Sequence, residues 1–375
     1  MRSLQPKRSE LGKSELGRIT PNRGGWPLGS AHPTAAAKPL YLEQDFGMDQ
    51  QSQLQLRRRS VLLRGLADIR LVTVNDGPGA GGRLLELRSP SGVAMDIALD
   101  RGGDILRLSF RGQELGWHSA NSAPAPWPQL DTEKGLGFLR GFDGFLVTCG
   151  LDHHGVATET SAADALYPLR KEHSHPLHGR IMACKAELIT KHIKWDDDLI
   201  EVVLVVRQTS VFGEVLELER KISVGLCRPE ISISDRVTNR GYRPTRHGIL
   251  YHFNIGYPLL DRSAKLVGET WDFQHFLDNG SAVPSDDHVE IVDAGVSPAP
   301  TENGLSVIGI ENELMKTRLL LKFDAAQLPV TALWRAFQSG VFALGLEPQT
   351  NLQADAPLSA GETRKYDLEL VLEEV

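Results

Sequence analysis

The chain has 375 residues, of which 41% are hydrophobic and 24% charged, an ordinary composition for a globular protein. Its formal net charge of -7 provides no basic footprint for nucleic acid. No apolar run approaches the ~18 residues of a membrane helix, and the three widely spaced cysteines form neither a disulfide framework nor a zinc motif. We therefore expect a cytoplasmic protein with no nucleic-acid and no membrane partner.

Residues 1–38 are expected to form a disordered tail. They are rich in Ser, Gly, Pro, Arg and Lys and show no hydrophobic period. No apolar segment follows the basic start, as it would in a secretory signal. We expect a single domain over residues 39–375, beginning near the apolar "PLYL" at 39–42.

From residue 61 onward, short alternating runs bounded by Gly, Pro, Asp and Asn predict β-strands. In chain order they occupy 83–100, 104–117, 192–209 with an Asp-rich turn at 196–198, 215–224, 230–239, 246–256, 317–324, 334–348 and 364–375. Helical patterns are confined to short segments near 49–65 and 161–166. Many strands without alternating helices predict an all-β sandwich or barrel.

Three long segments, 118–137, 150–176 and 261–305, interrupt the strands. Loops of this length are uncommon unless they serve a function or are disordered. Two of them carry aromatic and imidazole side chains, namely Trp127, His153, His154, His173 and His175. We expect these two segments to wall a site.

Glu347 ends an apolar strand in "VFALGLEP", on the same face as Val341, Ala343 and Gly345. A carboxylate in such a place is costly to bury without partners, which indicates a functional site. His252 and Asn254 share one face of another strand. A glutamate base, a histidine acid and side chains that hold hydroxyl groups make a reasonable set for acid–base chemistry on a sugar.

The segment "HSHPLHGRIMA" at 173–183 brings further histidines. If "LHGRIMA" is a strand, His178 and Arg180 share a face. His173 and His175 precede a proline and are expected in a loop. The plain alternatives are that a single histidine is a surface or core residue, and that Asp100 and Asp104 cap the turn at Gly102 and Gly103.

Six blocks taken together resemble the aldose 1-epimerase (galactose mutarotase) superfamily, and more closely its DUF4432 branch. They are "DRGGDI" at 100–105, "GFLVTCGL" at 144–151, "LHGR" at 177–180, "VTNRG" at 237–241, "LYHFNIGYPLL" at 250–260 and "EPQTN" at 347–351. The resemblance implies a large antiparallel β-sandwich, the galactose mutarotase-like supersandwich, with a few short helices and an open sugar cleft. It covers about residues 40–375.

The resemblance also implies a mechanism, in which a late glutamate takes the proton of the anomeric hydroxyl and a histidine protonates the ring oxygen. Glu347 matches the glutamate, and His178 matches the histidine of the "HG" motif. In typical mutarotases the histidine that acts as the acid lies four residues before an asparagine, whereas His252 lies two residues before Asn254. Both spacings are even, so His252 stays on the same face of the strand. The acid is either His252 or His178.

The remaining expectations concern the ligand. Arg180 and Arg140 are expected to clamp hydroxyl or anionic groups, since arginine offers a fixed fork of donors. Asn254, Asp104 and Gln349 complete the expected substrate contacts. The ligand is a small-molecule sugar, no cofactor or metal is expected, and the chain is a monomer or a homodimer.

Two alternatives stay open at this point. A shared fold does not fix function, so the chain is alternatively a non-catalytic sugar-binding protein. It is alternatively a metal-dependent sugar isomerase or lyase, because imidazoles with a carboxylate suit several metals. The ligands would then come from His153, His154, His173, His175, His178 and His252.

Overall fold

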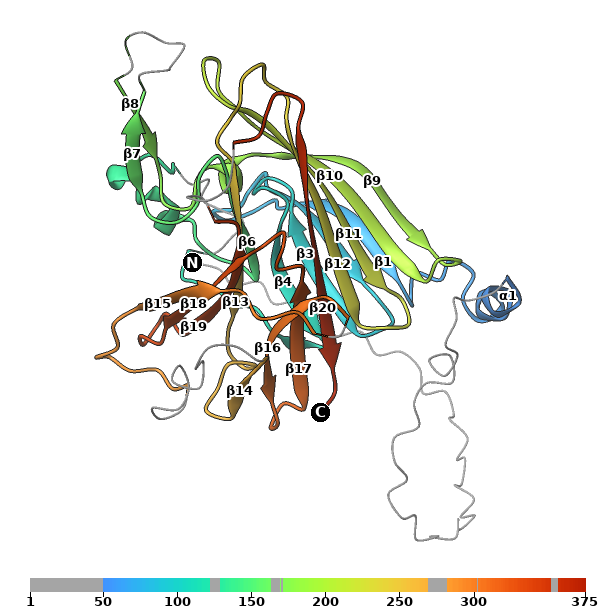
Figure 1. Cartoon of the computed structure of the whole chain (residues 1–375). Helices are drawn as coiled ribbons and strands as arrows, with labels where there is room; N and C mark the ends of the chain where they lie inside the picture. Colours follow the sequence, from blue (N-terminus) through green and yellow to red (C-terminus); the bar gives the residue numbers. More distant parts are fainter. Residues whose placement is uncertain are drawn as a thin grey trace, which may run out of the picture. The chain divides into compact units, whose positions relative to one another are not determined.

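Strands dominate the structure, a computed structural model that describes residues 50–121, 129–162, 169, 171–268, 282–301, 303–351 and 357–375 (Figure 1). The expected tail at 1–38, Trp127 and most of the expected helix at 161–166 lie outside the described residues. The expected helix near 49–65 is present as α1 (Gln50–Arg59). In the part of the chain that is described, no helix is both long and apolar enough to cross a bilayer.

The larger sheet has ten antiparallel strands. Its order is β1 (Asp68–Thr73), β2 (Arg83–Arg88), β3 (Val93–Ala98), β4 (Asp104–Phe110), β6 (Leu146–Leu151), β13 (Gly248–Ile255), β19 (Ala343–Gln349), β18 (Val330–Ala336) and β15 (Ile291–Val296), with β5 (Gln113–Glu114) beside β4.

The second sheet has eight strands. Its order is β14 (Ala264–Val267), β16 (Ser306–Asn312), β17 (Thr317–Phe323), β20 (Thr363–Glu373), β12 (Glu230–Asn239), β11 (Val215–Gly225), β10 (Leu199–Thr209) and β9 (Ala186–Lys194). A separate hairpin pairs β7 (Thr158–Ser161) with β8 (Glu172–His175). Short 3-10 helices are η2 (Glu133–Gly135), η3 (Gly137–Arg140) and η4 (Ile181–Ala183).

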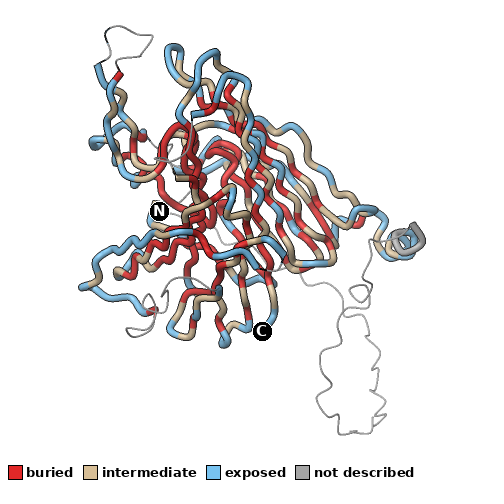
Figure 2. The backbone as a smooth tube through the Cα atoms, viewed as in Figure 1, coloured by how far each residue is buried: buried red, intermediate tan, exposed pale blue. Residues whose placement is uncertain are grey.

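Sequence alternation explains the sandwich. Along β12 every second residue is buried, as a strand with one face on a core requires (Figure 2). Side chains of both sheets meet in one hydrophobic core, for example Leu85 and Ile97 from the larger sheet and Leu218 and Leu370 from the smaller. The predicted all-β sandwich with few short helices is confirmed.

The long intervening segments hold more regular structure than the sequence indicated. The segment 150–176 contains the β7–β8 hairpin, and 261–305 contains β14 and β15. The strands in these segments are short or polar, and the first four residues of β15 are exposed. They therefore lack the alternation of apolar and polar residues that marks a half-buried strand.

A buried ion pair lies between the two sheets. Arg220 on β11 donates to both carboxylate oxygens of Asp235 on β12, at 2.9 and 2.6 Å. It also donates to the hydroxyl of Thr148 at 2.9 Å. Tyr251 donates to Asp235 at 2.8 Å. Because each group has partners, this network is compatible with a dry interior.

The central strands of the larger sheet are buried on both faces. On β13, Tyr251 and Phe253 face the inter-sheet core. Leu250 on the opposite face belongs to a second hydrophobic cluster, which we call the outer cluster. Its buried members are Trp117, Leu130, Phe138, Phe142, Val147, Cys149, Met182, Leu250, Trp334, Ala336 and Ala343. The outer cluster covers the face of β13, β19 and β18 that is turned away from the smaller sheet.

Candidate active site

The register of two neighbouring strands brings His252 and Glu347 together. β13 and β19 run antiparallel, with Phe253 opposite Leu346 and Asn254 opposite Gly345, so His252 lies opposite Glu347. The His252 Nε2 and Glu347 Oε1 atoms are 3.2 Å apart. Both side chains project into the face that the outer cluster covers, and both residues are buried.

Burial determines the charge of this pair. It raises the pKa of Glu347 to about 8, with a smaller contribution from the nearby carboxylate of Glu290. Burial also lowers the pKa of His252 well below its usual value, and the neighbouring His178 adds to this effect. Both shifts favour uncharged groups. At neutral pH the carboxyl group therefore keeps its proton and the imidazole stays uncharged, so the pair holds one titratable proton.

Aromatic rings enclose the pair. The ring of His252 lies 5.0 Å from Phe142 and 5.4 Å from Trp334, measured between centroids. Trp117 packs against both aromatic rings, at 5.2 Å from Phe142 and 5.8 Å from Trp334. Such walls exclude water and offer flat apolar surfaces to the C–H faces of a sugar.

Gly345 provides the space beneath the pair. It lies on β19 two residues before Glu347 and opposite Trp334 on β18. A Cβ atom at this position would lie 2.8 Å from Oε1 of Glu347, 2.9 Å from Cβ of Trp334 and 3.0 Å from Cε1 of His252. Any larger residue would therefore displace part of the site.

His178 lies beside His252, but not on a strand. The expected strand over "LHGRIMA" is wrong: His178 and Gly179 have φ angles of 60° and 75°, and η4 follows. Gly179 is required, because a Cβ atom would lie 2.1 Å from the carbonyl oxygen of His153. The chain therefore turns sharply, and the rings of His178 and His252 meet edge to face at 5.5 Å.

Burial keeps the ring of His178 uncharged. Burial, with a smaller contribution from His153, lowers its pKa to about 4. Its Nδ1 atom is buried and has no hydrogen-bond partner among the described residues. Phe138 packs against the ring at a centroid distance of 4.9 Å. The side chain can accept or donate one hydrogen bond to a ligand.

Other histidines of the segment 150–176 have partners of their own. Nδ1 of His175 lies 3.2 Å from Oδ2 of Asp152, and its Nε2 lies 3.0 Å from the hydroxyl of Thr160. His153 bonds the carbonyl of Val156 at 2.9 Å. Burial lowers the pKa of His154 to about 3. Within the described ranges, no group of three or more His, Cys, Asp or Glu side chains is arranged to hold a metal ion.

The two expected arginine clamps are engaged elsewhere. Arg180 donates to Asp131 at 2.7 Å and to the carbonyl of Ser174 at 2.8 Å. Arg140 is largely exposed on η3 and pairs with Glu133 at 2.6 Å. Neither arginine contacts the His252–Glu347 pair, so a contact of either with substrate stays a prediction.

The other residues expected to contact substrate, Asp104, Asn254 and Gln349, lie in three different places. Asp104 faces the inter-sheet interior, where it accepts the backbone N–H of Thr148 at 2.9 Å, and burial raises its pKa to about 6. Nδ2 of Asn254 donates to the carbonyl of Gly144 at 2.8 Å, which fixes β13 to the adjoining segment. Gln349 is half-buried at the end of β19, on the same face as the site glutamate.

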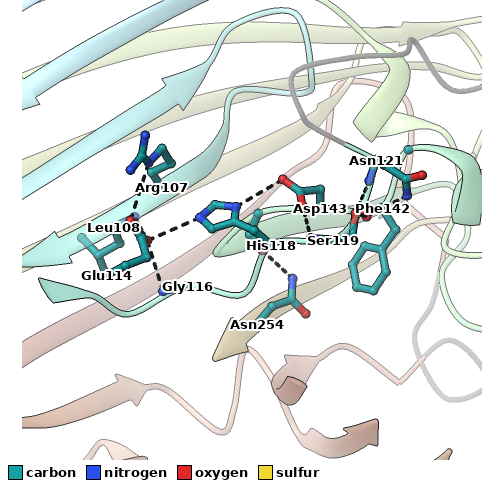
Figure 3. Close-up of polar contacts among 12 residues, drawn as sticks. Arg107, Leu108, Glu114, Gly116, His118, Ser119, Asn121, Phe142, Asp143 and Asn254 are labelled. Atoms are coloured by element: carbon teal, nitrogen blue, oxygen red, sulfur yellow. Dashed lines mark hydrogen bonds and ion pairs between the residues drawn. The ribbon is translucent and has the colours of Figure 1, made fainter. Parts of the chain in front are cut away.

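His118 supports the aromatic wall, a role that no sequence pattern predicted. His118 lies between two carboxylates, 3.3 Å from Asp143 and 3.6 Å from Glu114 (Figure 3). The hydrogen bond to Asp143, followed by that to Glu114, raises the pKa of His118 to about 9. Since His118 follows Trp117 and Asp143 follows Phe142, the bridge holds these two rings in place.

The fold is that of the galactose mutarotase-like proteins. A crystal structure from Klebsiella pneumoniae subsp. pneumoniae MGH 78578, provisionally named an aldose 1-epimerase, superposes with a TM-score of 0.72 at 23% identity, over 82% of this chain and 83% of that one. A galactose mutarotase-like protein from Clostridium acetobutylicum superposes with a TM-score of 0.58 at 16% identity, over 83% and 100% of the two chains.

The family is narrower than the fold. Residues 79–370 match DUF4432, a domain of unknown function, and the chain belongs to this family. A search among curated proteins gave no match. The resemblance drawn from the sequence blocks is confirmed at the levels of family and fold.

Proposed function

We propose that the protein is a carbohydrate mutarotase or epimerase that interconverts sugar anomers by acid–base ring opening. The observation that carries the proposal is the contact of His252 with Glu347, buried on a sheet face lined by aromatic rings. The mutarotase-like fold supports it. The substrate is a small-molecule sugar.

The one titratable proton of the His252–Glu347 pair is sufficient for both the acid and the base role. Transfer of this proton from Glu347 to Nε2 of His252 yields a carboxylate base beside an imidazolium acid. The carboxylate then takes the proton of the anomeric hydroxyl while the imidazolium protonates the ring oxygen. The bond between C1 and the ring oxygen breaks, and an open-chain aldehyde forms.

Ring closure reverses these steps on the other face. After rotation about the C1–C2 bond, the freed hydroxyl attacks C1 and returns its proton to His252. Glu347 protonates the former carbonyl oxygen, and the pair again holds one proton. Each positioned proton carrier contributes about 10²–10⁴-fold to such a reaction.

The surroundings fit this chemistry. The low dielectric of the buried site favours the neutral form of the pair at rest, so the ionic form is a transient state that is reached only during the reaction. His178, with its free Nδ1 among the described residues, is positioned beside His252 to bind a sugar hydroxyl. We assign the acid role to His252, since it contacts the glutamate directly.

The test is anomer exchange, measured by NMR or polarimetry on a panel of neutral and acidic aldoses. The expected result is acceleration for at least one sugar, lost by at least ~100-fold in Glu347→Gln with binding retained. Tight binding without acceleration of any sugar would favour a binding protein and contradict the proposal.

Two finer assignments accompany this function. We place the protein in the cytoplasm, because Cys149, Cys184 and Cys227 are all unpaired. We expect it to act as a monomer or homodimer, which light scattering of the purified protein would decide.

A further inference from the structure

Arg101 is a buried cation that forms an ion pair with no carboxylate among the described residues. The residue opens the "GGD" turn before β4 and is 1% exposed. It forms no ion pair within 4.0 Å with any described carboxylate, and its Nη1 atom is buried without a hydrogen-bond partner in the described part of the chain. Burial lowers the pKa of Arg101, but a guanidinium remains charged at neutral pH.

The other fully buried arginine provides an internal comparison. Arg220 is equally inaccessible, yet it forms a two-bonded ion pair with Asp235 and donates to Thr148 and to the carbonyl of Gly103. Breaking or omitting the partner of a buried charge costs several kcal/mol. A structural role explains Arg220 completely and leaves Arg101 unexplained.

The nearest acidic groups do not compensate Arg101. Asp104 and Asp143 act on it only at longer range. Asp104 accepts the N–H of Thr148, and Asp143 accepts hydrogen bonds from His118 and the backbone of Ser119. Oδ2 of Asp104 has no hydrogen-bond partner among the described residues, and it does not bond Arg101 either.

Arg101 lies at the edge of the candidate site. Its Nη2 atom donates to the carbonyl of Gly141 and contacts the sulfur of Met182 at 3.1 Å. Met182 is a member of the outer cluster, and Phe142, which follows Gly141, packs on His252 at 5.0 Å. A thioether is a weak acceptor on a flexible side chain, so an anionic group that displaced it would gain a charge-assisted hydrogen bond.

We propose that Arg101 binds the anionic group of the substrate, so that the site takes an acidic sugar, such as a sugar carboxylate or sulfonate. This inference rests on the proposed function, whose site it extends. A singly charged group matches one guanidinium that lies beside the thioether of Met182. Arg180 and Arg140 differ from Arg101, because each already pairs with a carboxylate, that of Asp131 and that of Glu133 respectively.

The experiment compares matched acids and neutral sugars by calorimetry. D-galacturonate is measured against D-galactose, D-glucuronate against D-glucose, and 6-sulfo-6-deoxyglucose against D-glucose. The wild type should bind one of the acids at least ~10-fold more tightly than its neutral partner, the energy of a hydrogen bond to a charged group. Arg101→Met should abolish this preference without changing the affinity for the neutral sugar, and Arg101→Lys should keep part of it.

Two controls separate binding from folding. Arg107→Met removes an arginine of β4 whose side chain is 62% exposed. This change should leave the affinity for the acid and the affinity for the neutral sugar unchanged. Because Arg101→Met removes an uncompensated buried charge, its melting temperature should equal or exceed that of the wild type. A lower melting temperature would assign Arg101 a structural role and overturn the inference.

The outcomes also separate this inference from the proposed function. Binding of an acid that depends on Arg101, without anomer exchange, contradicts only the function. Exchange of neutral sugars with no preference for any acid contradicts only the role of Arg101. Failure of every acid to bind overturns the inference as well.

Discussion

His252 and Glu347 occupy opposite positions on β13 and β19, with 3.2 Å between Nε2 and Oε1. In a low-dielectric interior, an imidazole and a carboxyl group in contact act as one titrating unit. Three protonation states are available to it, with two, one or no protons. Only the state with one proton supplies a base and an acid together.

The first prediction concerns the pH profile. Since the pKa of Glu347 is raised to about 8, kcat/KM should fall as pH increases above 8 and the pair loses its proton. Since the pKa of His252 is well below 6.5, kcat/KM should stay level as pH decreases through 6.5. Anomer exchange measured between pH 5.5 and 9.5 on an uncharged sugar tests both limbs. A decrease below pH 6.5 would show that a neutral histidine elsewhere is required.

The second prediction is that Glu347→Gln stabilises the protein while removing activity. Folding raises the pKa of the Glu347 carboxyl from 4.5 to about 8. Below pH 4.5 this group is neutral in both the folded and the unfolded chain, so it does not lower the stability of the fold. Between pH 4.5 and 8 the unfolded chain ionises this group and the folded chain does not, so stability falls with increasing pH. At pH 7 this difference corresponds to about 3 kcal/mol, which glutamine avoids.

Denaturant unfolding of the wild type and Glu347→Gln at several pH values checks this prediction. The gain in stability should shrink as pH approaches 4.5. Glu290→Gln serves as the control, because Glu290 is a second acidic group of the same region that bonds Trp334 at 2.9 Å. Equal stability of Glu347→Gln and the wild type at pH 7 would mean that Glu347 is ionised in the folded protein.

Strand alternation was enough to place some of the site. The face shared by Ala343, Gly345 and Glu347, and the face shared by His252 and Asn254, follow from the period of two that a strand imposes. The sequence could not indicate that β13 and β19 are neighbours, since residues of other strands lie between them in the chain. Their contact depends on the order of strands in the sheet.

Other parts of the site could not be predicted from the sequence. In the sequence Arg101 resembles a turn residue of "DRGGDI", and its lack of a carboxylate partner within the described residues depends on how the chain folds. Trp334 lies on β18, where residues on both faces are buried, so the strand pattern does not show which face holds a site. The segment "LHGRIMA" is not a strand, because His178 and Gly179 adopt left-handed backbone conformations that turn the chain.

The third prediction separates the backbone and the ring of His178. Because His178 has a φ of 60°, His178→Asn should fold normally, whereas His178→Ala should lose stability through strain. If His252 is the acid, His178→Asn should raise KM more than it lowers kcat, and His252→Gln should lower kcat by at least ~100-fold. Steady-state kinetics of the three variants, with melting temperatures, decide the matter. A larger loss of kcat in His178→Asn than in His252→Gln would assign the acid to His178.

The fourth prediction concerns the support of the aromatic wall. The pKa of His118 is raised to about 9, so its bridge stabilises the folded state fully below pH 6.5 and is lost as pH rises through 9. His118→Gln should therefore melt lower than the wild type at pH 6, and the difference should vanish near pH 10. His192→Gln, a change at an exposed histidine on β9, should show no such trend. A constant difference at all pH values would mean that packing, rather than charge, explains the contribution of His118.

The last prediction tests the space beneath the catalytic pair. Gly345→Ala adds one methyl group that would meet Glu347 at 2.8 Å and His252 at 3.0 Å, so the two side chains must move apart. A misplacement of about 1 Å in a reacting group can cost ~100-fold in rate, and we expect a loss of kcat of that order. Gly340→Ala is the matched control for a glycine-to-alanine change, because nothing lies within 4 Å of its Cβ position, although its φ of 84° adds some strain. If Gly345→Ala retained full turnover while the protein stayed folded, the contact of His252 with Glu347 would not be part of the mechanism.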